Sequence, residues 1–197
     1  HRMEKNTPAT MAPTMAPVHK EIPGNPSVAK SSTQKLNDRS NGKPLRVLSE
    51  EDWKFWIHNG YIVIKNAVPK ENCERLAKLL WEFEEKDPND PSTWYAPPRA
   101  EMQMKELTNT GMVEIYNHQY LWDNRSVQKV YDAFVDIWGT EKLWCTIDRA
   151  NLNFPIRPGF EYKGFIHWDY DPETKPQNVQ GVLAIADQTD ENMGGFQ

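Results

Sequence analysis

The chain has 197 residues, of which 38% are hydrophobic, and this is enough for one domain with a substantial core. Its formal net charge of −5 argues against a nucleic-acid partner, because phosphate contacts need clustered Lys and Arg. No apolar run is long enough to span a bilayer, and the first residues lack the apolar stretch of a secretory signal. We therefore expect a cytoplasmic protein with no membrane partner.

Residues 1–43 differ in composition from the rest of the chain. They contain no aromatic residue and carry a net charge of +4, which leaves −9 for residues 44–197. Their Pro, Ala, Thr and Ser show no apolar periodicity, so the segment cannot bury enough surface to offset its ordering entropy. We expect a disordered tail over 1–43, in which His1 and Arg2 are a cloning remnant, and a folded domain over 44–197.

The first predicted helix has a start signal and a stop signal. Ser49 fits an N-cap with Asp52 three residues later, as in a capping box. Gly60 suits the left-handed residue that ends a helix, which predicts a helix over 50–59. The apolar, β-branched run over 61–64 then predicts a short buried strand.

Two more helices are predicted before the late strands. One begins at Pro69, carries an apolar stripe and ends before Asp87-Pro88, and the proline-rich stretch 89–99 is predicted as a loop. The other covers 126–138 and is closed by Gly139. Its expected buried face consists of Val127, Val130, Tyr131, Phe134, Ile137 and Trp138.

Strands are predicted mainly in the last third of the chain. Leu143, Cys145 and Ile147 alternate with Trp144, Thr146 and Asp148, which predicts a strand there. Residues 182–186 form an apolar run. Helices first and strands later indicate an α+β fold with helices packed on a sheet. Cys73 and Cys145 are too few for a disulfide framework or a metal site, so a reducing compartment is expected and both thiols are predicted to be core residues.

His167-Trp168-Asp169 is the most informative motif. Two residues apart on an extended segment, the imidazole and the carboxylate point to the same side, with Cβ atoms roughly 6 to 7 Å apart. One metal ion can bridge that gap, and this ligand pair is part of the 2-His-1-carboxylate triad of non-haem Fe(II) sites. The alternative is a surface turn in which Asp169 hydrogen-bonds its own backbone.

The motif and its neighbours resemble the phytanoyl-CoA dioxygenase-like family. Residues 48–53 (Leu-Ser-Glu-Glu-Asp-Trp), 59–64 (Asn-Gly-Tyr-Ile-Val-Ile) and 68–69 (Val-Pro) are similar to its N-terminal part. Residues 164–169 look like its metal-binding strand, and 183–195 look like the strand and turn that follow. The resemblance covers residues 45–197 in the family's order.

The resemblance implies a double-stranded β-helix, a cupin-type jelly roll with buttressing N-terminal helices. It implies an Fe(II)- and 2-oxoglutarate-dependent dioxygenase that uses O₂ to oxidise a small molecule. His167 and Asp169 would be the first two iron ligands, and the carboxylate favours hydroxylation or a related C–H oxidation. Arg149 and Asn151 would bind 2-oxoglutarate, although Arg149 also suits a substrate carboxylate. A surface ion pair and a turn-stabilising amide are the alternatives for these two.

The family also needs a distal histidine ligand and an arginine for the far carboxylate of 2-oxoglutarate, and both would follow Gln197. We therefore expect residues 44–197 to be the N-terminal portion of an oxygenase-like domain. The C-terminal part of the jelly roll would be missing, and the chain by itself would be inactive. A non-catalytic jelly-roll binding or scaffolding module is the second hypothesis, and a cupin-like isomerase is the third. Substrate identity and oligomeric state are not predicted.

Other side chains are expected to be structural. His58 is expected on an exposed helix face, and His118 is expected to be a hydrogen-bonded histidine, with substrate contact as the alternative. Trp144 and Tyr170 are predicted to pack in the core rather than to line a pocket.

Overall fold

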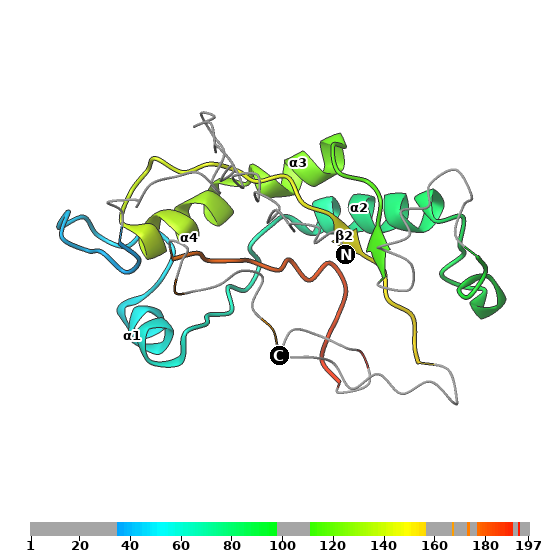
Figure 1. Ribbon diagram of the computed structural model, residues 1–197, viewed down its shortest axis with the longest axis horizontal. Coiled ribbons are helices and arrows are strands. Elements are labelled where there is room, and N and C mark those ends of the chain that lie inside the picture. Colours follow the sequence, from blue (N-terminus) through cyan, green and yellow to red (C-terminus); the bar gives the residue numbers. More distant parts are fainter. Residues whose placement is uncertain are drawn as a thin grey trace, which may run out of the picture.

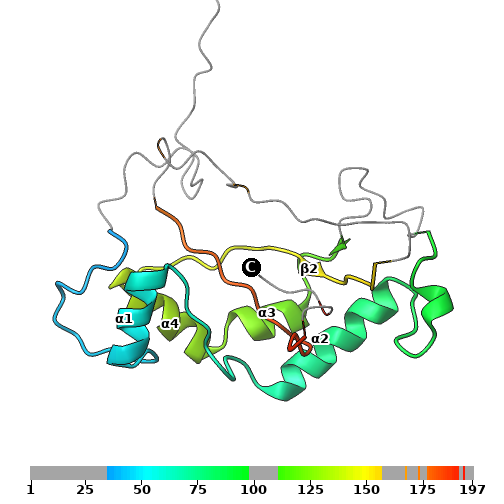
Figure 2. The same ribbon diagram turned by 90° about the horizontal axis from the view of Figure 1, so that it is seen from below.

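The computed structural model describes residues 35–97, 111–156, 167, 173, 177–190 and 193. In these residues, helices lie on one side and long extended segments cross them (Figures 1 and 2). The secondary-structure elements, in chain order, are α1 (Glu50–Asn59), α2 (Lys70–Phe83), the 3₁₀ helix η2 (Pro91–Thr93), β1 (Met112–Val113), α3 (Gln119–Arg125), α4 (Gln128–Trp138) and β2 (Ala150–Asn151).

Helix α1 has the predicted caps at both ends. Ser49 Oγ accepts a hydrogen bond from the Asp52 backbone N–H, and the Asp52 carboxylate accepts one from the Ser49 N–H, both at 3.0 Å. Gly60 ends the helix with a φ of 75° and donates its N–H to Trp56. The capping box and the glycine stop are both confirmed. The sequence could predict them because both depend only on local residues.

Helices α2 and α3 pack against each other and carry the main core. Pro69 is the N-cap of α2, and the helix ends at Phe83, earlier than predicted, because Glu85 adopts a φ of 57°. Helix α3 was not predicted from the sequence. Its N-cap is His118, whose Nδ1 accepts the Tyr120 N–H at 3.1 Å. The core between α2, β1 and α3 contains Leu76, Leu80, Val113 and Leu121.

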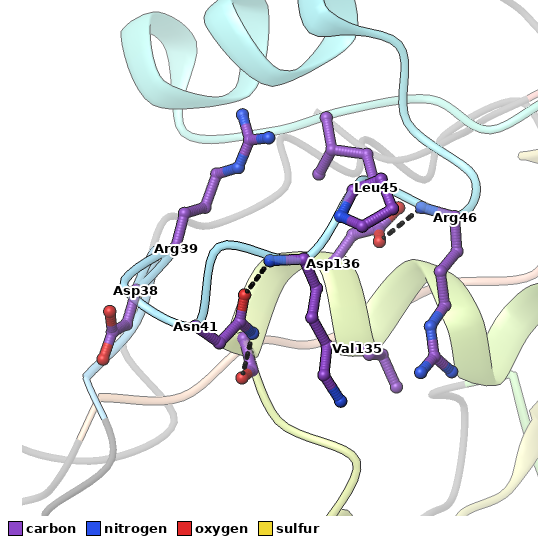
Figure 3. A pocket seen from close by; sticks show the side chains of 10 residues that line it. Asp38, Arg39, Asn41, Leu45, Arg46, Val135 and Asp136 are labelled. Atoms are coloured by element: carbon purple, nitrogen blue, oxygen red, sulfur yellow. Dashed lines mark hydrogen bonds between the residues drawn. The ribbon is translucent and has the colours of Figure 1, made fainter.

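Helix α4 ends at Gly139 as predicted, with a φ of 66°, but its buried face differs from the prediction. The buried residues are Ala133, Val135, Asp136 and Ile137, whereas most of the predicted face is only half-buried. The reason is that residues 36–48 cover the other side of the helix (Figure 3). The Asn37 N–H donates to the Ile137 carbonyl at 2.9 Å.

The packed part of the chain therefore includes residues 35–43, which were predicted as tail. The Trp56 indole N–H donates to Asn37 Oδ1 at 2.5 Å, and the Asn41 amide donates to the Gly139 carbonyl at 2.8 Å. A cavity of about 20 Å³ between this segment and α4 has room for about one water molecule. The rest of the predicted tail, residues 1–34, lies outside the described residues.

The strands predicted over 61–64, 143–147 and 182–186 do not form a ladder with any described residue. Residues 61–64 connect α1 to α2, and residues 143–147 and 182–186 follow extended paths across the helices (Figures 1 and 2). Within the described residues, the sheet consists of β1 and β2, which pair antiparallel with Met112 opposite Asn151 and Val113 opposite Ala150. The jelly roll remains a prediction, because strand pairing here would involve segments outside the described ranges.

Cys145 and Trp144 were predicted as core residues, and both are exposed, with Trp144 86% accessible. The reason is that residues 143–147 pair with no other residue in the described ranges, so no sheet buries their side chains there. Cys73 is half-buried in α2, and burial raises the pKa of its thiol.

None of the helices in the described ranges combines the length and the apolar character needed to cross a bilayer.

Candidate functional site

The predicted site residues fall in two segments of the chain, 149–151 and 167–169. Arg149 directly precedes β2 and is half-buried, and Asn151 lies in β2 and is exposed. His167 is exposed, whereas Asp169 lies outside the described residues. The structure thus brings Arg149 and Asn151 together on one strand, while the geometry of the predicted ligand pair stays a prediction.

The pairing of β1 with β2 gives these two residues a common direction. Val113 is buried in the core against α2 and α3, and Ala150, its partner across the ladder, packs against the same cluster. Side chains alternate along a strand, so Asn151 and Arg149 belong to the opposite face. The Leu152 N–H donates to the Gly111 carbonyl at 2.8 Å and continues the pairing. Arg149 and Asn151 therefore share the face that points away from the helical core.

The Arg149 guanidinium lies over an aromatic ring. Its Cζ is 5.5 Å from the ring centroid of Tyr116, and Nη1 donates to the Tyr116 hydroxyl at 3.4 Å. Its ion pair with Asp148 is loose, since Nε lies 3.8 Å from Oδ1 of a carboxylate side chain that is 71% exposed. Such an exposed pair contributes little to stability.

A second arginine joins the two chain segments around this guanidinium. Arg125, the last residue of α3, donates Nη1 to the Tyr116 carbonyl at 3.2 Å and Nη2 to the Asp148 carbonyl. Its own Cζ lies 5.1 Å from the Trp122 ring centroid. Neither Tyr116 nor Arg125 was singled out from the sequence, because α3, which ends at Arg125, is too short to give a clear apolar period.

An aromatic cluster fixes the chain after β2. The Phe154 ring stacks on Trp94 at 5.8 Å and meets Trp81 and Tyr95 edge-on at 5.6 and 6.0 Å. The Tyr95 hydroxyl donates to the Pro155 carbonyl at 2.5 Å. These contacts join the predicted loop after α2 to the end of β2.

A pocket of about 320 Å³ has none of the predicted site residues in its lining. It is lined by Val47, Leu48, Asp52, Val63, Ile64, Lys65 and Lys129. Lys129 donates its ammonium to the carbonyls of Lys65 and Asn66 at 2.8 and 3.1 Å, so this charge is used in tying α4 to the chain after α1.

Within the part of the chain that the structure describes, no three His, Cys, Asp or Glu side chains gather as a metal site. His118 is the structural, hydrogen-bonded histidine that was predicted, because its imidazole caps α3. His58 is exposed on α1, also as predicted.

Comparison with known proteins gives one informative similarity. The chain is 29% identical over 142 residues to "Ava biosynthesis cluster protein O" of Aspergillus versicolor, a match that covers 68% of this chain and 45% of the relative. The chain thus spans less than half the length of this curated relative. No family model and no solved structure matches this chain.

Proposed function

We propose that the chain is part of a phytanoyl-CoA dioxygenase-like enzyme, an Fe(II)- and 2-oxoglutarate-dependent dioxygenase that oxidises a small molecule. The observation that carries this proposal is the His167-x-Asp169 spacing downstream of a strand that places Arg149 and Asn151 on one face. The similarity to a biosynthesis cluster protein is compatible with small-molecule oxidation.

The donor chemistry of these residues fits the proposed groups. An imidazole and a carboxylate suit a borderline divalent metal such as Fe(II), and they leave coordination positions for other ligands. A guanidinium and an amide suit the carboxylate and keto oxygens of 2-oxoglutarate.

Each residue has a distinct role in this proposal. His167 and Asp169 would hold the iron, which together with 2-oxoglutarate and O₂ supplies oxidation of a C–H bond to C–OH, with succinate and CO₂ as co-products. Arg149 would bind a carboxylate through its planar fork, and Asn151 would donate its amide N–H to the co-substrate. These two residues would orient the co-substrate before the reaction, and the protein's contribution is this positioning.

The test uses the full-length protein under anaerobic conditions, followed by addition of O₂. We expect one Fe(II) per chain by equilibrium dialysis and release of succinate from 2-oxoglutarate. His167→Ala and Asp169→Ala should each abolish succinate release and weaken iron binding by at least about 10-fold. His58→Ala, which removes an exposed histidine of α1, is the matched control and should behave like the wild type.

Absence of iron binding and of succinate release in the wild type would refute the proposal. That result would favour the alternative, a jelly-roll binding or scaffolding module. Equal losses in His58→Ala and His167→Ala would likewise count against a specific ligand role for His167.

A further inference from the structure

We propose that Tyr116 and Arg125 are positioning residues that hold the Arg149 guanidinium ready for a carboxylate of 2-oxoglutarate. This inference rests on the proposed function and extends it to two side chains outside the motif that suggested it. Its basis is the set of contacts that join the segment after β1, the end of α3 and the segment before β2.

The first contact is the stacking of Arg149 on Tyr116. A guanidinium 5.5 Å above a ring centroid is attracted by the negative ring face and keeps its N–H donors directed outward in the guanidinium plane. The hydroxyl of Tyr116 accepts from Nη1 at 3.4 Å, which restricts rotation of the guanidinium within that plane. Among the described residues, no partner is bonded to Nη2. The arginine is thus oriented by one neighbour while part of its fork is left for a ligand.

The second contact is the bridge made by Arg125. Its two terminal nitrogens bind the carbonyls of Tyr116 and of Asp148, the residue immediately before Arg149. A single guanidinium therefore fixes the backbone of both stacking partners. The planar fork of arginine presents its donors in fixed directions, whereas the ammonium of lysine is a point charge on a flexible stem.

The third feature is the rigidity of the support. Arg125 ends α3 and lies 5.1 Å from the Trp122 ring centroid, and α3 is anchored in the core by the buried Leu121. A cation in the last turn is also favoured by the helix dipole. These contacts link Arg149 to the α2–α3 core and restrict the movement of its side chain. Pre-organisation of this kind lowers the entropy lost when the ligand binds.

The test is 2-oxoglutarate binding to the full-length protein loaded with Mn(II), measured by calorimetry without turnover. We expect Arg125→Lys and Tyr116→Ala to raise the Kd for 2-oxoglutarate about 10-fold, and Tyr116→Phe to raise it about 3-fold, because it keeps the ring and removes the hydroxyl. The Kd for Mn(II) should stay within about twofold of the wild type in all three, since none of these residues is a proposed ligand. Trp144→Ala, a change at an exposed aromatic residue, should alter neither constant.

Tyr116→Phe decides the test even where another variant is less stable, because the phenyl ring retains the packing of the tyrosine. A wild-type protein that binds 2-oxoglutarate, with unchanged affinity in Tyr116→Phe and Arg125→Lys, would overturn the positioning role and leave the proposed function intact. If the variants lost Mn(II) binding in parallel with 2-oxoglutarate binding, the positioning role would also be overturned, because such a loss indicates general misfolding. A wild type that binds neither would refute the proposed function itself.

Discussion

The Asp136 carboxylate in α4 accepts a hydrogen bond from the backbone N–H of Leu48 at 3.0 Å, and both residues are buried. The same carboxylate accepts the backbone N–H groups of Arg46 and Val47, each at 2.8 Å (Figure 3 shows the bond from Arg46). Three consecutive backbone donors thus share one buried acceptor. This contact fixes the chain that leads into α1 against the side of α4.

Asp136→Asn should lower the free energy of unfolding by about 3 kcal/mol, because the introduced NH₂ group would face backbone donors and leave at least one of them unpaired. Urea denaturation of the two proteins measures the difference. Asp132→Asn is the matched control one turn away, where the carboxylate pairs with Arg46 at the surface, and it should cost clearly less than Asp136→Asn. Equal effects of the two substitutions would contradict the role given to Asp136.

Gly139 and Gly60 both end a helix in the left-handed conformation, yet they differ in their surroundings. A Cβ at Gly139 would lie 1.8 Å from the backbone carbonyl oxygen of Asp38, whereas a Cβ at Gly60 would meet nothing within 4 Å. Gly60→Ala should therefore cost about 1 kcal/mol, the strain of a positive φ alone. Gly139→Ala should cost about 3 kcal/mol, because the backbone of residues 36–41 must also move. Thermal and urea denaturation would show a smaller loss for Gly139→Ala if that segment did not pack here.

Acid should weaken the contacts that Arg39 and Arg46 make with α1 and α4. Hydrogen bonds from Arg46 lower the pKa of Asp132, and hydrogen bonds from Arg39 lower the pKa of Glu50. Since both pKa values are lower in the folded state, these groups stabilise the protein at neutral pH, and this contribution is lost as the pH falls through their folded-state values. The Asp132→Asn/Glu50→Gln double variant should therefore lose less stability than the wild type between roughly pH 5 and pH 3. An unchanged acid dependence of the urea midpoint would contradict this.

Phe154 joins the loop after α2 to the end of β2 through three aromatic neighbours. Phe154→Ala should lower stability by about 2 kcal/mol, because the ring is half-buried and loses a stacked partner and two edge-on partners. Trp144→Ala deletes a larger aromatic side chain that is exposed, and it should change stability by no more than about 0.5 kcal/mol. Limited proteolysis of the loop after α2 provides a second measurement, with faster cleavage expected only in Phe154→Ala.

Asn151→Ala should weaken 2-oxoglutarate binding about 10-fold if its amide donates to the co-substrate, since a hydrogen bond to a charged ligand is lost. Asn153→Ala is the control, because Asn153 is the same residue type two positions further along and is also exposed. Calorimetry with the Mn(II)-loaded full-length protein distinguishes the two. Equal affinity in both variants would leave Asn151 as a structural amide, the alternative considered from the sequence.

The sequence predicted those parts of the fold that depend on neighbouring residues. The capping box at Ser49 and the stops at Gly60 and Gly139 involve residues within one helical turn, and each is present. The strand over 143–147 required a partner far away in the chain, which alternation cannot supply, so Trp144 is exposed rather than buried. The predicted buried face of α4 was right at Ile137 and otherwise wrong for the same reason, because residues 36–48 cover the other side of the helix.

The candidate site shows the same limit. Arg149 and Asn151 were singled out through the resemblance to the family, and the structure puts them directly before β2 and within it. Tyr116 and Arg125 were missed because their importance comes from contacts over 33 and 23 residues, Tyr116 to Arg149 and Arg125 to Asp148. A helix as short as α3 has too few apolar positions to produce a periodic pattern, so the cation at its end could not be placed.

The two hydrogen bonds of Asn37 have a practical consequence for shortening this chain. With a φ of 64°, Asn37 receives the Trp56 indole N–H and donates its own N–H to Ile137, so one side of α1 and the end of α4 meet at a single residue. A recombinant version that starts at residue 44 would remove this joint although it keeps every helix. Expression trials should therefore retain the residues from Lys35 onward.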